Sequence, residues 1–292
     1  MSAVSAARSP VPVSLPAGTK LLGEVISWTC SGVAVTHPAL VEALTAAGLD
    51  PAVARELAPR HAFTRACKKL SDARIIRRVA EDETTLTFQF TQETRSTDRL
   101  EYVLETMLTL DKQTGKVTCG LPGLATLAQE ELDRAVTART GADVTRVIQK
   151  LFERHADLFP VRPQGGVYFV PERHVGFVEK VQSLLGRLGG QVLRFPVPAG
   201  TAEGDRSVKD AVAAGLAALI DEHRQAIAAF GSDTRDGTLD RAADRIRSTQ
   251  FKVAAYAEYL LDEKGKLDRE LAAARDELRA KVEQLATSPA LA

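Results

Sequence analysis

The sequence predicts an α+β fold: an antiparallel β-meander with flanking helices, followed by a C-terminal α-helical hairpin with coiled-coil character. Two patterns carry this prediction. Within residues 73–119 apolar and polar side chains alternate, as in the run from Leu86 to Phe90 and again from Leu100 to Leu110, which is typical of half-buried strands with one polar face. Beyond residue 207, apolar residues recur every seven positions, which is typical of helices packed along a seam.

The elements around the meander follow from apolar spacing and from Gly, Pro and Asp at the expected ends. Before it, we predict a strand from Leu22 to Trp28, a helix over 40–47 closed by Gly48, and a short helix that Asp50 caps and Pro51 begins. After it, we predict helices over 124–136, 144–155 and 177–185 and strands over 167–171 and 192–197.

Composition shifts predict four consecutive segments. Residues 1–17 are rich in Ser, Ala and Pro and are expected to be a mobile arm. An α+β domain covers 18–198, with a sub-boundary near residue 120 left open. A linker over 199–206 then leads to a helical hairpin over 207–287, whose second helix is predicted to run from about residue 239 to about residue 285.

The composition excludes several classes of protein. The 38 Lys and Arg residues balance 38 Asp and Glu residues, so the chain as a whole is neither a polycation nor an acidic tail. Three cysteines, Cys30, Cys67 and Cys119, are too few and too widely spaced for a disulfide framework or a cysteine-based zinc site. No run approaches the roughly 18 apolar residues that span a bilayer. We expect a cytoplasmic protein with no membrane partner.

Sequence motifs for nucleotide binding, zinc hydrolysis, dithiol chemistry and serine hydrolysis are all absent. We therefore expect no catalytic residues, no metal site and no cofactor. Catalytic groups that meet only in space stay open as an alternative, because triads need no sequence proximity.

One segment is strongly basic. Residues 60–78 hold seven Lys and Arg residues and one acidic residue, and several of these cations fall opposite the apolar helix stripe through Phe63 and Leu70. A cationic helix face beside a basic strand is suited to several phosphates. The candidate nucleic-acid-binding residues are His61, Arg65, Lys68, Lys69, Arg74, Arg77 and Arg78. The alternative is a solvated face whose charges pair with Glu81, Asp82 and Glu83.

The C-terminal heptads predict assembly, because a long apolar seam is poorly soluble alone. An intramolecular hairpin with no partner is the alternative. The candidate oligomerisation residues are Leu239, Ile246, Val253, Leu260, Leu267, Leu271, Leu278 and Leu285.

Three other features are interpreted as structural. His155 ends an apolar helix stripe and is expected to be partly buried. The triplets Glu153-Arg154-His155 and Glu172-Arg173-His174 are interpreted as a coincidence. The run Gly165-Gly166-Val167-Tyr168-Phe169 fits a core strand better than a base-stacking platform, because adjacent strand residues point to opposite faces. A winged-helix alternative also stays open here.

Trp28 in the opening strand, the segment from Ala62 to Ala66, the run from Gly165 to Pro171 and the long terminal helices together resemble an uncharacterised bacterial family found in chromosomes and mobile elements. The resemblance implies order and architecture and transfers no activity. The sequence thus predicts a non-enzymatic oligomerising scaffold or adaptor, joined through its C-terminal helices to itself or to another protein. A nucleic-acid-binding protein that uses the 60–78 face for DNA or RNA, with avidity from oligomerisation, is the alternative.

Overall fold

The α+β class is confirmed by the computed structural model, which describes residues 18–72, 74–95, 100–162, 164–232, 234–260 and 263–287. The arm expected over 1–17 lies outside these residues. The described residues form two compact units. One comprises residues 18–29, 152–179 and 191–287, and the other comprises residues 30–151 and 180–190. We call them the bundle unit and the meander unit. They are interleaved along the sequence, whereas the expected segments are consecutive.

A four-stranded antiparallel sheet lies in the bundle unit, with the strand order β10-β1-β9-β8. Its strands are β1 (Leu21–Thr29), β8 (Phe159–Pro160), β9 (Tyr168–Pro171) and β10 (Gln191–Pro198). Gly23 of β1 permits close pairing with β9, because a Cβ atom there would lie 2.1 Å from the Val170 carbonyl oxygen. Beside it, the buried Glu24 accepts two hydrogen bonds of 2.7 Å from Arg194 of β10.

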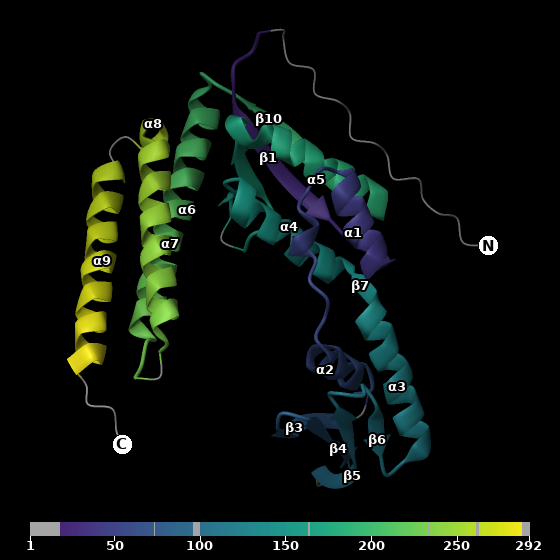
Figure 1. Cartoon of the computed structure of the whole chain (residues 1–292). Coiled ribbons are helices and arrows are strands. Elements are labelled where there is room, and N and C mark those ends of the chain that lie inside the picture. Colours follow the sequence, from purple (N-terminus) through teal and green to yellow (C-terminus); the bar gives the residue numbers. More distant parts are fainter. Residues whose placement is uncertain are drawn as a thin grey trace. The chain divides into compact units, whose positions relative to one another are not determined.

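Three long helices of the bundle unit lie side by side (Figure 1): α6 (Ala202–Ala228), α7 (Asp236–Ala255) and α9 (Lys264–Thr287). The helix predicted over 239–285 is therefore wrong as a single element. It ends at Tyr256, continues in the short α8 (Ala257–Leu260), and folds back as α9. A straight helix of that length would span about 70 Å at 1.5 Å per residue and would outrun α6, whereas the fold-back packs α9 against both α6 and α7.

The sheet and the helices of the bundle unit share one core. Phe159 and Phe169 are 3% and 1% exposed and lie in the same cluster as Val212 and Leu216 of α6. Gly215 permits this approach, since a Cβ atom there would lie 2.8 Å from the Phe159 ring. Residues 199–206, expected to be a linker, form a short turn and the beginning of α6.

The predicted meander is confirmed in the meander unit as a sheet with the order β3-β4-β5-β6. Its strands are β3 (Arg74–Glu81), β4 (Thr85–Arg95), β5 (Leu100–Asp111) and β6 (Val117–Cys119). The helices α2 (Pro59–Lys69) and α3 (Pro122–Thr137) cover one face (Figure 1), and Phe63 and Leu132 share a core with Phe90 and Leu108. This core continues past residue 120.

A β-bulge changes which side chains of β5 face that core. Phe90 of β4 is opposite Thr106, but Thr91 is opposite Leu104, so Glu105 is the extra residue. The sequence alternation places Leu100, Tyr102 and Leu104 on the buried face with Leu108 and Leu110, and this expectation is wrong. The bulge turns the first three to the opposite face, where they are 51%, 55% and 53% exposed.

The remaining elements include the predicted helices, together with two short strands at 34–36 and 138–140 and a 3₁₀ turn at 172–174 that the sequence analysis does not predict. They are β2 (Ala34–Thr36), α1 (His37–Ala46), a 3₁₀ turn (Pro51–Val53), β7 (Ala138–Thr140), α4 (Gly141–His155), a second 3₁₀ turn (Glu172–His174) and α5 (Val175–Leu188). Asp50 caps the first 3₁₀ turn by accepting a hydrogen bond from the Ala52 amide. Across the described ranges, no helix is long and apolar enough to cross a membrane. The three cysteines are free thiols.

The three-helix core predicts unequal losses from two apolar truncations in α9. Leu267 is 2% exposed and Val282 is 39% exposed. Leu267→Ala should lower the free energy of unfolding by about 2–5 kcal/mol, because it leaves a cavity, whereas Val282→Ala should cost less than about 1 kcal/mol. Urea unfolding monitored by circular dichroism measures both values. Equal losses at the two positions would contradict the fold-back.

Candidate functional site

The seven candidate nucleic-acid-binding residues belong to α2 and β3 and do not form one face. His61, Arg65, Lys68 and Lys69 lie on α2, and Arg74, Arg77 and Arg78 lie on β3. On β3, Arg74 and Arg78 share the side of Ile76, which packs on the core beneath α2. Arg77 is opposite Gln89 and points to the other side of the sheet. The basic run is thus divided between two faces.

Arg65 is held by a carboxylate distant in sequence. Its guanidinium donates hydrogen bonds of 2.9 and 2.5 Å to the two carboxylate oxygens of Asp143. Burial opposes the ionisation of Asp143, but the hydrogen bonds from Arg65 and Thr140 outweigh it and lower the pKa to about 2. This bidentate pair fixes the start of α4 to α2.

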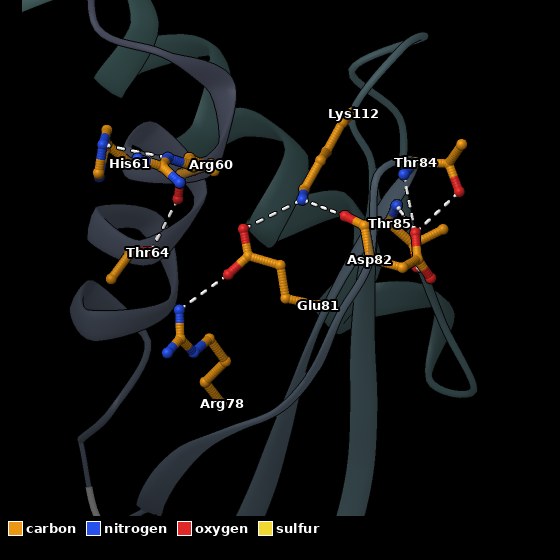
Figure 2. A network of polar contacts seen from close by, with 9 residues as sticks. All are labelled: Arg60, His61, Thr64, Arg78, Glu81, Asp82, Thr84, Thr85 and Lys112. Carbon is orange, nitrogen blue, oxygen red and sulfur yellow. Dashed lines mark hydrogen bonds and ion pairs between the residues drawn. The ribbon is translucent and has the colours of Figure 1, made fainter. Parts of the chain in front are cut away.

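Three further basic residues have carboxylate partners. Lys69 lies 2.9 Å from Glu131, Arg74 forms two hydrogen bonds of 2.5 and 2.9 Å with Glu105, and Arg78 lies 2.8 Å from Glu81. Figure 2 shows Glu81 between Arg78 and Lys112, whose ammonium group lies 3.0 Å from it. The hydrogen bond from Lys112, and the charges of Lys112 and Arg78, lower the pKa of Glu81. Of the proposed partners Glu81, Asp82 and Glu83, Glu81 takes this role.

The nearby Asp82 closes the β3–β4 turn. Its carboxylate accepts hydrogen bonds from the backbone amides and hydroxyl groups of Thr84 and Thr85 (Figure 2). These bonds hold its pKa well below the usual range. Asp82 is therefore a turn residue.

His61, Lys68 and Arg77 are the exposed remainder of the candidate set. His61 accepts a hydrogen bond of 3.2 Å from Arg60 (Figure 2). Lys68 and Arg77 are on different faces of the sheet-and-helix layer, so they do not make a continuous cationic surface.

An apolar stripe runs along β5 on the face away from α2 and α3. It consists of Leu100, Tyr102, Leu104 and Met107, each about half exposed. Thr87, Gln89 and Thr91 of β4 lie beside it on the same face. Exposed apolar patches of this kind mark interaction surfaces.

The candidate oligomerisation residues lie inside the chain's own bundle. Six of them, Ile246, Val253, Leu260, Leu267, Leu271 and Leu278, are at most 6% exposed and belong to one core cluster. Leu239 packs against the same cluster, and Leu285 is half-buried. Their burial needs no second chain.

A buried polar network in the bundle unit has no counterpart in the sequence predictions. The carboxylate of Asp157 accepts hydrogen bonds from Tyr256 at 2.6 Å, Arg173 at 3.0 Å and His174 at 3.2 Å, and it pairs with Lys252 at 2.6 Å. Arg173 also stacks over the Tyr256 ring at 4.2 Å. Two of the four partners, Arg173 and His174, belong to the second of the two triplets whose likeness to each other is interpreted as a coincidence.

The network favours the ionised form of Asp157 and the neutral form of Tyr256. Burial opposes the charge of Asp157, but hydrogen bonds from His174, Lys252 and Tyr256 outweigh it and hold the pKa well below its usual range. Burial, together with the hydrogen bond to Asp157, raises the pKa of Tyr256 far above its usual range. Because both carboxylate oxygens are occupied, the network is suited to fixing the α7–α8 bend.

The aromatic run is a core strand, as the strand alternation predicts. Phe169 is buried in the bundle core, and Tyr168 on the other face stacks on Trp28 with 5.0 Å between ring centroids. The prediction for His155 is wrong, because its side chain is exposed beside Phe177.

Comparison with known proteins gives a single result. Residues 21–290 match the profile of a family described as a family of unknown function, DUF6744. No curated protein and no solved structure matches the chain. Among the described side chains, no group of three His, Cys, Asp or Glu residues is arranged to hold a metal ion.

The Asp157 network predicts a large and pH-dependent loss of stability in Asp157→Asn. The change leaves Lys252 and Arg173 without their carboxylate, and because both cations are partly exposed, we expect a loss of about 1.5–3 kcal/mol at pH 7. Because the folded-state pKa is lowered, the ionised group stabilises the fold above about pH 4, and this contribution disappears as the pH falls further. Urea unfolding at several pH values measures it.

The matched control is Asp244→Asn, which removes an exposed pair with Arg247 in α7. It should cost less than about 1 kcal/mol. The difference in stability between wild type and Asp157→Asn should shrink below pH 4. A difference that stays constant down to pH 2 would show that the charge of Asp157 is not what stabilises the bend.

Proposed function

The chain belongs to the family of unknown function DUF6744, and since no activity comes with that membership, we propose from the geometry that it is a scaffold that assembles through the β5 strand of its meander unit. The occupant of this surface is a second copy of the chain. The single observation that carries the proposal is the exposed apolar stripe Leu100, Tyr102, Leu104 and Met107.

The edge of β5 supports a second copy as the partner. In the described sheet, the neighbour of β5 opposite β4 is the short β6, which pairs with Leu108–Leu110. The part of β5 from Leu100 to Met107 therefore offers backbone donors and acceptors for another strand. Two such edges can form backbone hydrogen bonds with each other if the two strands pair antiparallel about a two-fold axis. Two-fold symmetry is the commonest symmetry of dimers.

Side-chain pairing favours one register. If two copies pair about Tyr102, Leu100 of each strand lies opposite Leu104 of the other, and Glu101 lies opposite Val103. This arrangement joins six apolar side chains on one face and places no like charges opposite each other. A pairing about Val103 would instead place Glu101 opposite Glu105, which is unfavourable.

The C-terminal helices support assembly less well than β5. Their heptad residues already fill the core of the chain's own bundle, so an intermolecular seam through the same residues would have to open that core. Self-association through these helices stays a prediction that the light-scattering experiment below tests, and their binding to another protein also stays a prediction.

Light scattering coupled to size-exclusion chromatography tests the proposal. The wild type should elute with a mass of twice 31.4 kDa. Leu104→Lys should weaken self-association about tenfold or more, because it places a charge in a desolvated contact. The matched control is Leu127→Lys in α3, which is 52% exposed and should leave the mass unchanged. A monomeric wild type, or equal effects of the two variants, would overturn the proposal.

Nucleic-acid binding is the competing function, and the ion pairs of Arg65, Lys69, Arg74 and Arg78 support it less. Fluorescence anisotropy with labelled single-stranded and duplex DNA and RNA measures it. We expect no salt-sensitive binding. Salt-sensitive binding that Lys68→Glu and Arg77→Glu abolish, with the dimer intact, would instead favour the nucleic-acid function.

The cellular compartment and the bacterial origin of the chain are also proposals. The three free cysteines support a reducing, cytoplasmic compartment. A bacterial origin in chromosomes or mobile elements rests on the sequence resemblance.

A further inference from the structure

A cleft of about 640 Å³ lies between α6 and α7 in the bundle unit, with Glu153 of α4 at its margin. This volume falls in the range of pockets that hold small organic molecules. The cleft shares no residue with the β5 stripe or with the basic segment.

The α6 side of the cleft is mostly apolar. Leu219, Ile227 and Phe230 line it, and Ala226 keeps it open between them. From α7, the buried Ile246 extends this apolar surface. The wall is suited to an aliphatic or aromatic body rather than to a sugar.

The α7 side presents hydrogen-bond donors. Thr238, Arg241, Arg245, Ser248 and Lys252 line the cleft at alternating spacings of three and four, which is one face of a helix. None of the α7 residues that line the cleft is acidic. This wall is therefore suited to the negatively charged head group of a ligand.

A neutral polar pair lies between the two walls. His223 of α6 and the buried Thr249 of α7 are joined by a hydrogen bond of 2.8 Å. Burial, and then the charge of Arg245, lowers the pKa of His223. The imidazole is thus uncharged at neutral pH. Lys252 is paired with Asp157, so among the described residues that line the cleft, Arg241 and Arg245 are the cations without a carboxylate partner. Arg241 also donates hydrogen bonds to the Gly237 carbonyl and the Thr238 hydroxyl group.

We propose that this cleft binds an amphipathic organic monoanion, with its apolar body against Leu219, Ile227 and Phe230 and its acidic group on Arg241 and Arg245. A ligand with several negative charges fits less well, because Glu222 and Glu153 also border the cleft. A carboxylate or sulfonate on a body of about ten carbon atoms has the required chemistry.

Fluorescence titration of the full-length protein with 1-anilinonaphthalene-8-sulfonate tests the site, with decanoate as the competitor. The probe should bind saturably, and decanoate should displace it at least about tenfold more effectively than decanol, which lacks the charge. Arg245→Glu should weaken probe binding about tenfold or more, which corresponds to about 1.4 kcal/mol. Ala226→Leu should also weaken it, by filling the apolar part.

The matched control is Arg247→Glu. Arg247 is exposed on the same helix, pairs with Asp244 and does not line this cleft, so the variant should bind the probe like wild type. Circular dichroism checks that each variant is folded. Three results would each overturn the proposal: equal probe affinity of Arg245→Glu and wild type, an equal loss of affinity in Arg247→Glu, or equal displacement of the probe by decanol and decanoate. Because Arg245 is exposed, its variant keeps the test valid even if Ala226→Leu does not fold.

Discussion

The ionised Asp157 side chain is the constraint on which the bundle unit depends. A buried carboxylate is tolerated only when donors replace the water it has lost. Here the donors come from three places in the sequence: the 3₁₀ turn with Arg173 and His174, Lys252 in α7, and Tyr256 at its end. Lys252 and Tyr256 are four residues apart on one face of the helix, so their contacts hold the C-terminal end of α7 against Asp157.

The bend in turn decides what the heptads do. Once the chain reverses after α8, the apolar positions of α9 face α6 and α7, and the ion pair between Arg224 and Glu277 joins α6 to α9 at 2.6 Å. A seven-residue period indicates that one face of a helix is apolar, but it does not indicate which helix covers that face. The sequence therefore predicts the buried residues of this region, whereas the contacts of Lys252 and Tyr256 with Asp157 join positions about 100 residues apart, which no local pattern encodes.

In the meander unit too, the features that could be predicted depend on local sequence, and those that could not depend on residues distant in the chain. Alternation predicts β4 well, because Leu86, Phe88 and Phe90 are all buried. The charge count over 60–78 is also correct, but the partners Asp143 and Glu131 come from α4 and α3, far along the chain. Because carboxylates from distant elements pair with several of these cations, a local excess of positive charge is a poor guide to an open phosphate-binding face.

Arg74 connects the charge pattern to the apolar stripe. Its two hydrogen bonds hold Glu105, the extra residue of the bulge. Because side chains alternate with period two, one extra residue exchanges the faces of everything beyond it. Leu100, Tyr102 and Leu104 keep the same sequence parity as Leu108 and Leu110 and yet lie on the opposite side of the sheet. Arg74, which the sequence predicts to bind phosphate, thus contacts the extra residue of the bulge instead, and that bulge turns three apolar side chains to the face that we propose for assembly.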